Sequence, residues 1–274
     1  MSKEVVYENP PLIEVICELR WPLKVYRQYG NQPIDKYYHD YESEFSSFIS
    51  EKGYKEVQSR IPADMPVEIL GSAPVLQLRK EKDTWPLFQI GPGLFTANTV
   101  PPYNGWSSFR NDFHLGLEAL YKSYPAASSL LKFSQMELRY INGFDEKFDY
   151  SPENFRDYSK HEFGFGFSLS EAIEKSAVER EKIAFISSFN FDLKDIKDSL
   201  ANIKIAKGQQ KNKDSLILEL GITKKFKEST IQEQEDVAKW FDDAHRVISR
   251  WFDMSVSKKI REKMGKTKTI EVNN

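Results

Sequence analysis

Arginines within predicted strands and on a predicted helix are the residues of this sequence best suited to bind an anionic ligand. Arg20 and Arg139 interrupt the apolar faces of two strand-like segments, and Arg110 lies on a helix-like one. A guanidinium group binds carboxylate or phosphate through paired hydrogen bonds. The same side chains can instead pair with neighbours such as Glu18 or Glu137 on the outer face of a sheet. We favour this second interpretation, because exposed ion pairs are common and contribute little energy.

The aromatic segment "TVPPYNGW", at residues 99–106, is the second candidate for ligand contact. Tyr103 and Trp106 would form the rim of a site beside the start of the following helix. Trp106 can equally be the first core residue of that helix, which the usual burial of large aromatic side chains favours. The candidate site for a phosphorylated or carboxylated ligand therefore consists of Arg20, Arg139, Arg110, Tyr103 and Trp106.

The histidines and the single cysteine do not form a pattern that carries metal or nucleophilic chemistry. His39, His114, His161 and His245 are scattered, without the paired spacing of a zinc site. His245 lies between core positions of the last predicted helix, where a buried, hydrogen-bonded role is favoured over a site role. Cys17 lies in the middle of an apolar strand, where a thiol is inert. We predict no metal and no cofactor; enzymatic activity stays open, and a non-catalytic role is favoured.

The last 20 residues carry a local excess of positive charge. Six basic residues stand against Glu262 and Glu271: Lys258, Lys259, Arg261, Lys263, Lys266 and Lys268. They surround a helical apolar stripe, which suits docking to an acidic protein partner or to nucleic acid. The candidate partner-binding residues are Lys258, Lys259, Arg261 and Lys263. A solvated terminal helix with a frayed end is the favoured alternative, since such tails are common.

Composition excludes several classes of protein. The 274 residues carry a net charge of -2, with 40% hydrophobic and 29% charged residues, as in a folded globular chain without low-complexity character. This charge balance gives no overall attraction to nucleic acid, so nucleic acid binding is expected through the tail alone. One cysteine permits no intrachain disulfide. With neither a secretory signal nor an apolar run of about 18 residues, we predict a cytoplasmic protein without membrane contact.

The spacing of apolar residues predicts the elements that would position these side chains. Helical periodicity covers residues 34–49, 106–121 and 230–252, and alternating segments predict antiparallel strands, one of them at 163–169. Residues 151–158 predict a loop with a helical turn. The pattern is that of an α+β fold, a largely antiparallel sheet with long amphipathic helices packed on it. No linker divides the chain, so we predict one domain over residues 1–254 and a basic C-terminal helix and tail over 255–274.

Two short segments of the sequence are similar to one another. In "CELRW", at residues 17–21, and "MELRY", at residues 136–140, Glu and Arg alternate with apolar residues. Each segment is followed by predicted strands and then by an aromatic-rich helix. Two related halves, residues 1–125 and 133–253, that pair into one sheet would give this order. Four matching residues can also arise by chance, so both explanations stay open.

Four longer segments carry a resemblance to a known family. They are "NPPLIEVICELRW" at 9–21, "FQIGPGLFTANTVPPYNGWSSFRNDF" at 88–113, "LRYIN" at 138–142 and "HRVISRWFDMSVSKKIREKMG" at 245–265. They resemble a family of functionally uncharacterised proteins of about this length, distributed sporadically in bacteria and archaea. The resemblance spans nearly the full chain and implies a single prokaryotic domain. It implies no cofactor or catalytic residue, because the family has no established activity.

Two hypotheses for the function follow. The first is a non-catalytic accessory or neutralising protein in a phage-defence or toxin-antitoxin setting, which the sporadic distribution of the family resembles. It predicts a protein partner that a chain ending at Asp253 would lose, and the sequence also allows a homodimer. The second is a small-ligand-binding protein, or an enzyme that acts on a phosphorylated or carboxylated ligand at the candidate site.

Overall fold

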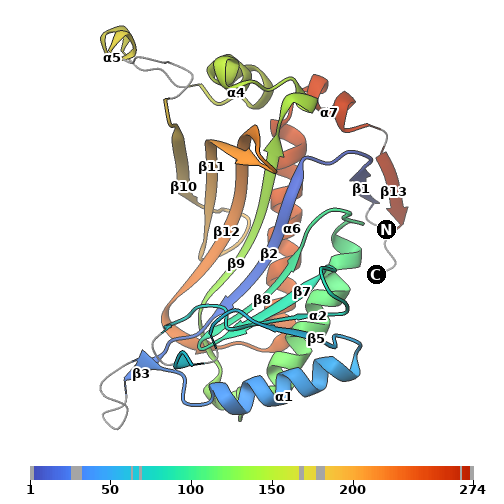
Figure 1. The fold of residues 1–274 in the computed structure, drawn as a ribbon, viewed down its shortest axis with the longest axis vertical. Coiled ribbons are helices and arrows are strands. Elements are labelled where there is room, and N and C mark those ends of the chain that lie inside the picture. The colour runs from blue at the N-terminus through green and yellow to red at the C-terminus, as the bar shows by residue number, and fades with distance from the viewer. Residues whose placement is uncertain are drawn as a thin grey trace.

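The fold is α+β, with helices packed on one face of a large antiparallel sheet (Figure 1). The structure, a computed structural model, describes residues 3–25, 33–62, 64–67, 70–166, 170–176, 183–265 and 267–271. Its strands are β1 (Lys3–Tyr7), β2 (Leu12–Arg20), β3 (Lys24–Val25), β4 (Pro33–Ile34), β5 (Glu56–Ser59), β6 (Leu76–Arg79), β7 (Leu87–Gly91), β8 (Leu94–Thr99), β9 (Lys132–Phe144), β10 (Ile186–Asp192), β11 (Ser199–Gln210), β12 (Lys213–Ile231) and β13 (Thr267–Glu271). Its helices are α1 (Tyr38–Glu51), α2 (Trp106–Ser123), α3 (Ala127–Leu130), α4 (Phe155–Phe163), α5 (Glu171–Lys175), α6 (Gln234–Ser255) and α7 (Lys258–Met264), with 3-10 turns η3 (Glu146–Phe148) and η4 (Pro152–Asn154).

The large sheet has nine strands in the order β10-β11-β12-β9-β2-β8-β7-β6-β5. In the first half of the chain β2 pairs with β8, and β7 and β6 follow outward; in the second half β9 pairs with β12, and β11 and β10 follow outward. A long helix ends each half, α2 after β8 and α6 after β12. The strand direction turns from β10 to β7, as the twist of a sheet requires (Figure 1). The two halves share one strand order, and a duplication as its origin stays a prediction.

The pairing of β2 with β9 joins the two halves, and its register is symmetric. Glu18 lies opposite Glu137, and these residues hold the same position in the segments "CELRW" and "MELRY". Rotation about an axis through this pair exchanges the two segments. Because side chains alternate along a strand, Arg20 and Arg139 then project from the same face of the sheet as the two glutamates.

The helices bury their apolar stripes against the opposite face of the sheet. In α6 the residues Val237, Phe241, Ala244 and Ile248, spaced three and four positions apart, are at most 2% exposed. Full burial of a side chain such as Phe241 stabilises the fold by about 2 kcal/mol. α6 packs on β9, β12 and α2, and α1 packs on α2 and β7. The face that these helices cover therefore holds the hydrophobic core. The opposite face, here called the open face, lies away from these helices, although Glu18, Thr96 and Asn98 on it are at most 6% exposed.

Four segments differ from the elements that the sequence predicts. The first helix, predicted from residue 34, begins at Tyr38, because Pro33 and Ile34 form β4. β12 runs on to Ile231, so α6 begins at Gln234 and not near residue 230. Residues 151–158 form η4 and the first part of α4, because Ser151 and Asn154 make a capping box. The strand predicted at 163–169 is wrong for residues 163–166, since α4 runs to Phe163 and Gly164, with a φ of 74°, ends it in the left-handed conformation. Residues 167–169 lie outside the described residues.

The C-terminal segment 255–274, expected as a basic helix and tail, packs on the rest of the chain where it is described. Val256, Ile260 and Met264 are at most 1% exposed and belong to the main hydrophobic core. Ser257 caps α7 by accepting the N–H of Ile260 at 3.1 Å. β13 pairs with β1, which brings the two ends of the chain together (Figure 1).

Candidate functional site

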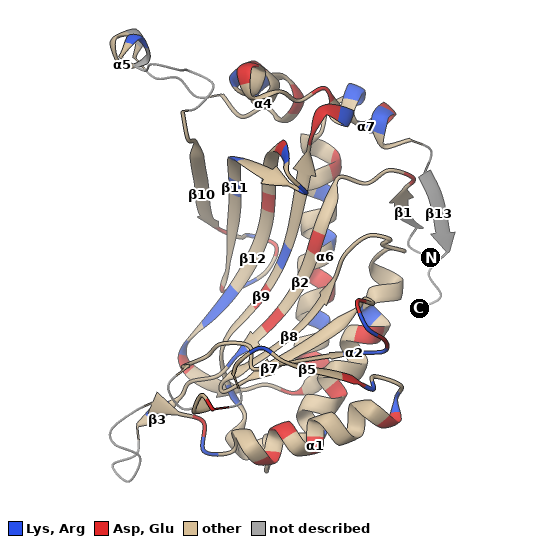
Figure 2. Cartoon of the chain, viewed as in Figure 1, with Lys and Arg blue, Asp and Glu red and all other residues tan. Residues whose placement is uncertain are grey.

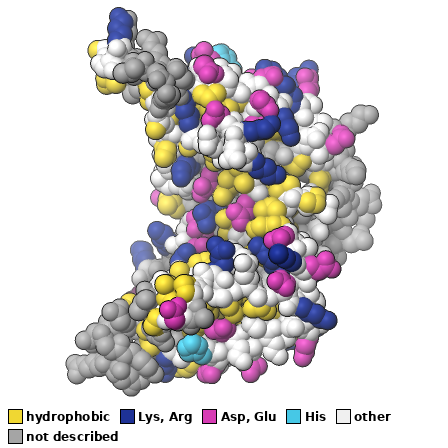
Figure 3. Space-filling view, in the orientation of Figure 1, with side chains coloured by type: hydrophobic (Ala, Val, Ile, Leu, Met, Phe, Trp, Pro, Cys, Tyr) yellow, Lys and Arg dark blue, Asp and Glu magenta, His cyan; other side chains and the backbone are white. Residues whose placement is uncertain are grey.

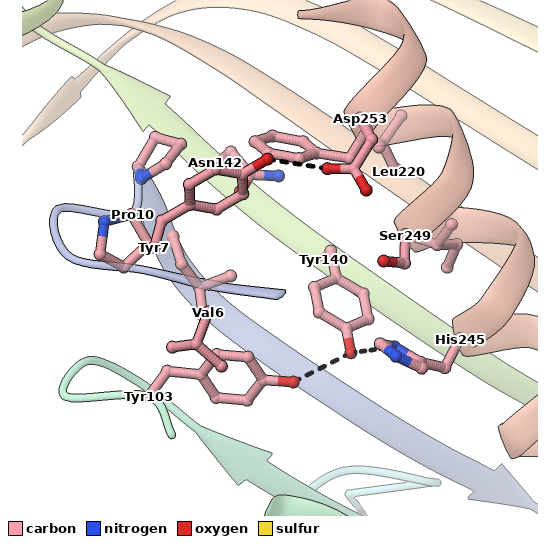
Figure 4. A pocket seen from close by; sticks show the side chains of 14 residues that line it. Val6, Tyr7, Pro10, Tyr103, Tyr140, Asn142, Leu220, His245, Ser249 and Asp253 are labelled. Atoms are coloured by element: carbon pink, nitrogen blue, oxygen red, sulfur yellow. Dashed lines mark hydrogen bonds between the residues drawn. The ribbon is translucent and has the colours of Figure 1, made fainter. Parts of the chain in front are cut away.

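A pocket lies between the N-terminal segment, α6 and the helix-covered face of β9 and β12 (Figure 4). Its volume is about 100 Å³. An apolar cavity of roughly 150 Å³ holds benzene in another protein, so this smaller volume limits an enclosed ligand to about the size of one small ring. Apolar side chains form most of the wall, among them Val6, Leu12, Leu220, Ile248 and Phe252. Such a wall with a few convergent polar groups is typical of sites for small molecules.

Three polar side chains form a row of hydrogen bonds at one wall of the pocket (Figure 4). The hydroxyls of Tyr103 and Tyr140 are 3.2 Å apart, and the Tyr140 hydroxyl lies 2.8 Å from Nδ1 of His245. When Nδ1 of His245 carries no proton, the Tyr103 hydroxyl donates to Tyr140 and the Tyr140 hydroxyl donates to Nδ1. When Nδ1 is protonated, it donates to Tyr140, and the Tyr140 hydroxyl donates to Tyr103. The row can therefore adapt its direction to a donor or an acceptor in the pocket.

Elements distant in the sequence position this row. Tyr140 lies on β9 opposite Val15 of β2 and Leu220 of β12, so its side chain points to the helix-covered face with theirs. His245 lies at the margin of the apolar stripe of α6, where it is half-buried. Tyr103 belongs to the loop that leads from β8 into α2. The row is therefore complete only when the sheet, α6 and this loop are assembled.

Trp106, the first residue of α2, packs its indole flat against the His245 ring. The ring centroids are 4.8 Å apart and the planes are 9° from parallel. The indole N–H donates to Asp242 at 2.9 Å, three residues before His245 on α6. Arg110 donates to both oxygens of the same carboxylate, at 2.7 and 2.8 Å. This paired contact ties α2 to α6 and holds the indole against the imidazole.

Burial lowers the pKa of His245 to about 4, from an ordinary value of 6.5. The Asp242 carboxylate acts in the opposite direction, and Arg246 adds to the lowering. The imidazole is therefore neutral near pH 7, and it offers one acceptor and one donor nitrogen. The hydrogen-bonded role expected for His245 is present in its contact with Tyr140, and a site role stays a prediction for a residue that also lines the pocket.

The N-terminal segment closes one side of the pocket through a contact with α6. The Tyr7 hydroxyl donates to Asp253 at 3.0 Å (Figure 4). Burial, reinforced by this carboxylate, raises the pKa of Tyr7 to about 12, so the phenol stays protonated as a donor. Pro10 and Pro11 separate β1 from β2, because they have no N–H to donate to a strand, and both line the pocket.

The structure divides the five predicted ligand-binding residues between the two faces of the sheet. Tyr103, Trp106 and Arg110 lie at the pocket or support it on the helix-covered side. Arg20 and Arg139 lie on the open face, at non-adjacent positions of β2 and β9. The five residues do not form one site. Anion binding by Arg20 and Arg139 stays a prediction that concerns a different surface.

On the open face, acidic groups surround the two strand arginines, and Figure 2 shows the mixed charges along the central strands. Arg20 lies 2.5 Å and Arg139 3.8 Å from the carboxylate of Glu18. Arg139 also lies 3.9 Å from Glu137 and 4.0 Å from Glu219. Figure 3 shows that hydrophobic side chains lie between charged ones of both signs on this side of the molecule. This balance favours pairing within the sheet over capture of an anion.

The four predicted partner-binding residues lie on α7 and differ in their contacts. Lys259 and Lys263 bind the carboxylate of Asp149 at 2.9 and 2.7 Å. Lys258 forms an ion pair within α7 at 3.7 Å, and Arg261 is exposed. At least part of this positive charge is therefore used inside the chain, and partner binding through α7 stays a prediction.

Tyr7, Tyr140 and Ser249 line the pocket although their spacing did not single them out. Tyr140 carried a usable signal, because it alternates with the buried Met136 and Leu138 on one face of β9, where a phenol hydroxyl needs a partner. Tyr7 and Ser249 carried none, since their proximity depends on how the N-terminal segment meets α6.

Other chemistries find no support in the described parts of the chain. No group of three or more His, Cys, Asp or Glu side chains there is placed to hold a metal ion. Cys17 is fully buried, and burial raises the pKa of its thiol, as expected for an inert cysteine. Within the same ranges, no helix combines the length and apolar character needed to cross a membrane.

Comparisons of the chain with protein-family models, with curated proteins and with solved structures found no match. The pocket and its polar wall are therefore the basis for a functional proposal.

Proposed function

We propose that the chain is a ligand-binding protein whose ligand is small, neutral and mainly apolar, with one hydrogen-bonding group. The observation that carries the proposal is the hydrogen-bonded row of Tyr103, Tyr140 and His245 at one wall of an otherwise mainly apolar pocket. Apolar walls supply affinity, and a few convergent polar groups orient the ligand. Because the row can reverse its direction, it suits an alcohol, a phenol or an amide.

The charges around the pocket favour a neutral ligand over an anion. The lining residues include the carboxylate of Asp253 and, among the described side chains, no lysine or arginine. His245 is neutral near pH 7 because its burial lowers its pKa. An anion would lose its hydration in this pocket without gaining a cation. The phosphorylated or carboxylated ligand expected from the sequence is therefore not the one that this pocket favours.

Small aromatic probes test the proposal directly. Phenol and benzyl alcohol are neutral probes with one hydroxyl, and benzoate is an anionic probe of similar size. Saturation-transfer NMR and titration of backbone amide shifts measure the binding of each to the full chain. We expect both neutral probes to bind, and benzoate to bind about tenfold more weakly or not at all, because the anion has no cation to replace its hydration. Binding of benzoate in preference to phenol would contradict the proposal.

A matched pair of variants assigns the binding to this pocket. Tyr140→Phe removes the central hydroxyl of the row and keeps the ring. We expect its affinity for phenol to fall about three- to tenfold, the effect of one hydrogen bond. Tyr121→Phe is the control, since the Tyr121 hydroxyl donates to the Gln232 carbonyl at 2.6 Å and lies outside the pocket. Equal phenol affinity in Tyr140→Phe and the unchanged chain would contradict the assignment.

The accessory-protein function in a defence or toxin-antitoxin setting stays a prediction beside this proposal. Affinity purification from native cells, with mass spectrometry of the protein and small-molecule fractions, separates the two. A small neutral molecule that the chain retains, and that Tyr140→Phe retains in smaller amount, supports ligand binding. A stoichiometric protein partner without a retained molecule supports the accessory function.

A further inference from the structure

The outer strand of the large sheet, β10, lacks the features that usually keep an edge strand from pairing with another chain. Among the described strands it pairs only with β11, so one row of its backbone groups faces outward (Figure 1). Its sequence "ISSFNFD" contains no proline and no basic residue, and its one charge is Asp192 at the end. Its register with β11 is continuous, without a bulge. Edge strands commonly carry a lysine, a proline or a bulge instead.

Hydrogen bonds at the two ends of β10 identify the backbone groups that face outward. The N–H of Leu193 donates to the Ser199 carbonyl at 2.9 Å, and the N–H of Lys207 donates to the Phe185 carbonyl at 3.1 Å. Odd-numbered residues of this strand therefore bond to β11. Because the direction alternates along an antiparallel strand, the N–H and C=O groups of residues 186, 188, 190 and 192 point away from the sheet.

The three large apolar side chains along this edge are exposed. Ile186 is 70% exposed, Phe189 45% and Phe191 43%. The two phenylalanines lie on the helix-covered face, where Phe191 contacts Trp251 of α6 with ring centroids 5.8 Å apart. Figure 2 shows β10 as an almost uncharged strand at the margin of the sheet. Exposed aromatic rings beside free backbone groups are suited to pairing with a further strand.

We propose that β10 is a homodimer interface, where it pairs antiparallel with β10 of a second copy of this chain, Asn190 opposite Asn190. In this register Phe189 of each copy lies opposite Phe191 of the other. Both are positions without hydrogen bonds across the new pair, where side chains approach most closely and aromatic pairs stabilise a sheet. Asp192 lies opposite Ser188, so no like charges meet. The strand is thus complementary to itself, which specifies a second copy as the occupant.

The open face of the same strand supports this register. Asn202 of β11 donates to Asn190 at 2.7 Å and to Ser188 at 3.2 Å, which makes a polar row across the outer strands. Opposed Asn190 amides at the twofold axis would continue this row from one copy to the other, because each amide can both donate and accept.

Single cysteines placed in the full chain test the register. The native Cys17 is fully buried and does not compete. Two copies of Asn190→Cys would place their Cα atoms about 5.5 Å apart, within the range of a disulfide. In two copies that carry Asp192→Cys, the two cysteines would lie four residues apart along the paired strands. This distance is about 13 Å, which a disulfide does not span. We expect oxidised Asn190→Cys to form a covalent dimer and Asp192→Cys to remain a single chain on a non-reducing gel.

Opposite charges at the same position test the interface without a covalent bond. The unchanged chain should sediment as a dimer at tens of micromolar. Asn190→Lys and Asn190→Glu should each sediment as a monomer, because each brings two like charges together, and an equal mixture of the two should form a dimer again. A monomeric unchanged chain, a dimer that survives both single charge variants, or equal crosslinking of the two cysteine variants would each overturn the proposal.

Discussion

His245 links the pocket to the stability of the whole fold, because its surroundings favour the neutral imidazole. Its pKa is about 4 in the folded chain, against about 6.5 when unfolded. Between these values the unfolded state binds the proton more readily. The contribution of His245 to stability is therefore complete above about pH 6.5 and decreases as the pH falls toward 4. The loss is about 2 kcal/mol at pH 5.

The variant His245→Asn isolates this effect, since it keeps a hydrogen-bonding side chain near Tyr140 and removes the titration. Urea unfolding at pH 7 and pH 5 measures the difference in the free energy of unfolding. We expect this difference to be about 2 kcal/mol smaller in His245→Asn than in the unchanged chain. His161→Asn, at an exposed position of α4, is the control and should behave as the unchanged chain does. Equal pH dependence in all three proteins would show that His245 titrates normally.

At the scale of residues, the sequence singles out some of the side chains that line the candidate pocket, but it does not show that they meet. Tyr103 and Trp106 follow as candidates from an aromatic segment beside a helix start, whereas for His245 the helical stripe favours a buried, hydrogen-bonded role over a site role. That Trp106 stacks on His245 depends on which helices meet, and spacing along one chain does not encode this. Arg139 drew attention to its strand, whereas the contact to His245 is made by Tyr140, the next residue, which points to the opposite face.

At the scale of elements, α2 lies close to the sheet because it has a glycine where it crosses two buried rings. A Cβ atom at Gly116 would lie 2.5 Å from the ring of Phe88 and 2.8 Å from that of Phe95, and both rings are fully buried. Gly116→Ala should gain about 1 kcal/mol of helix propensity and lose more to overpacking. We expect a net destabilisation of about 1 kcal/mol or more by urea unfolding. Ser108→Ala, exposed on the same helix, should be neutral or stabilising; a stabilised Gly116→Ala would mean that the rings move aside at little cost.

The C-terminal elements belong to the hydrophobic core, so the chain ending at Asp253 is not a clean test of partner binding. A chain that ends at Asp253 loses α7, β13 and the buried side chains of Val256, Ile260 and Met264. Each of these contributes about 1.5 to 3 kcal/mol, and together they approach the whole stability of an ordinary domain. We expect the truncated chain to show no cooperative thermal transition by circular dichroism. Retention of the full melting temperature would contradict this.

A pair of substitutions at exposed positions of α7 avoids this loss of the core. Lys258→Gln with Arg261→Gln removes two positive charges and leaves Ile260 and Met264 in place. Its melting temperature should stay close to that of the unchanged chain, since exposed ion pairs contribute about 1 kcal/mol or less. Loss of a partner by this folded double variant would assign binding to α7. Loss by the truncated chain alone would not, because that chain is expected to unfold.

Elements with strong periodicity were predictable from sequence, and elements that depend on caps were not. The stripe of α6 and the β11–β12 hairpin follow from apolar spacing. The start of α6 was misplaced because residues up to Ile231 are drawn into a long strand by pairing with β9, a tertiary effect that overrides the local pattern. The sequence predicts only a helical turn where α4 begins, because the capping box of Ser151 and Asn154 spans four residues and starts η4, which leads directly into α4.

The two halves of the molecule share a strand order without having separate cores. β2 and β9, the first large-sheet strand of each half, pair with one another at the centre of the sheet, and α2 contacts α6. The fully buried Val15, Leu19 and Leu138 come from both sides of that central pair. Each half taken alone would expose one face of its helices and the backbone groups of its central strand. Local spacing predicted the elements of each half, but their mutual dependence follows only from this central pairing.

Dividing the chain before β9 tests this dependence. Fragments 1–131 and 132–274 each retain all of their own strands and helices. We expect neither fragment to unfold cooperatively in urea, because an unpaired central strand and an uncovered apolar face leave too little buried area for a stable core. Mixed or co-expressed, the fragments should associate and regain slow amide exchange in β2 and β9, since the pairing of these strands needs no covalent link. A cooperative transition in either isolated fragment would instead show that this half is a domain in its own right, and β2–β9 would then be an interface between domains.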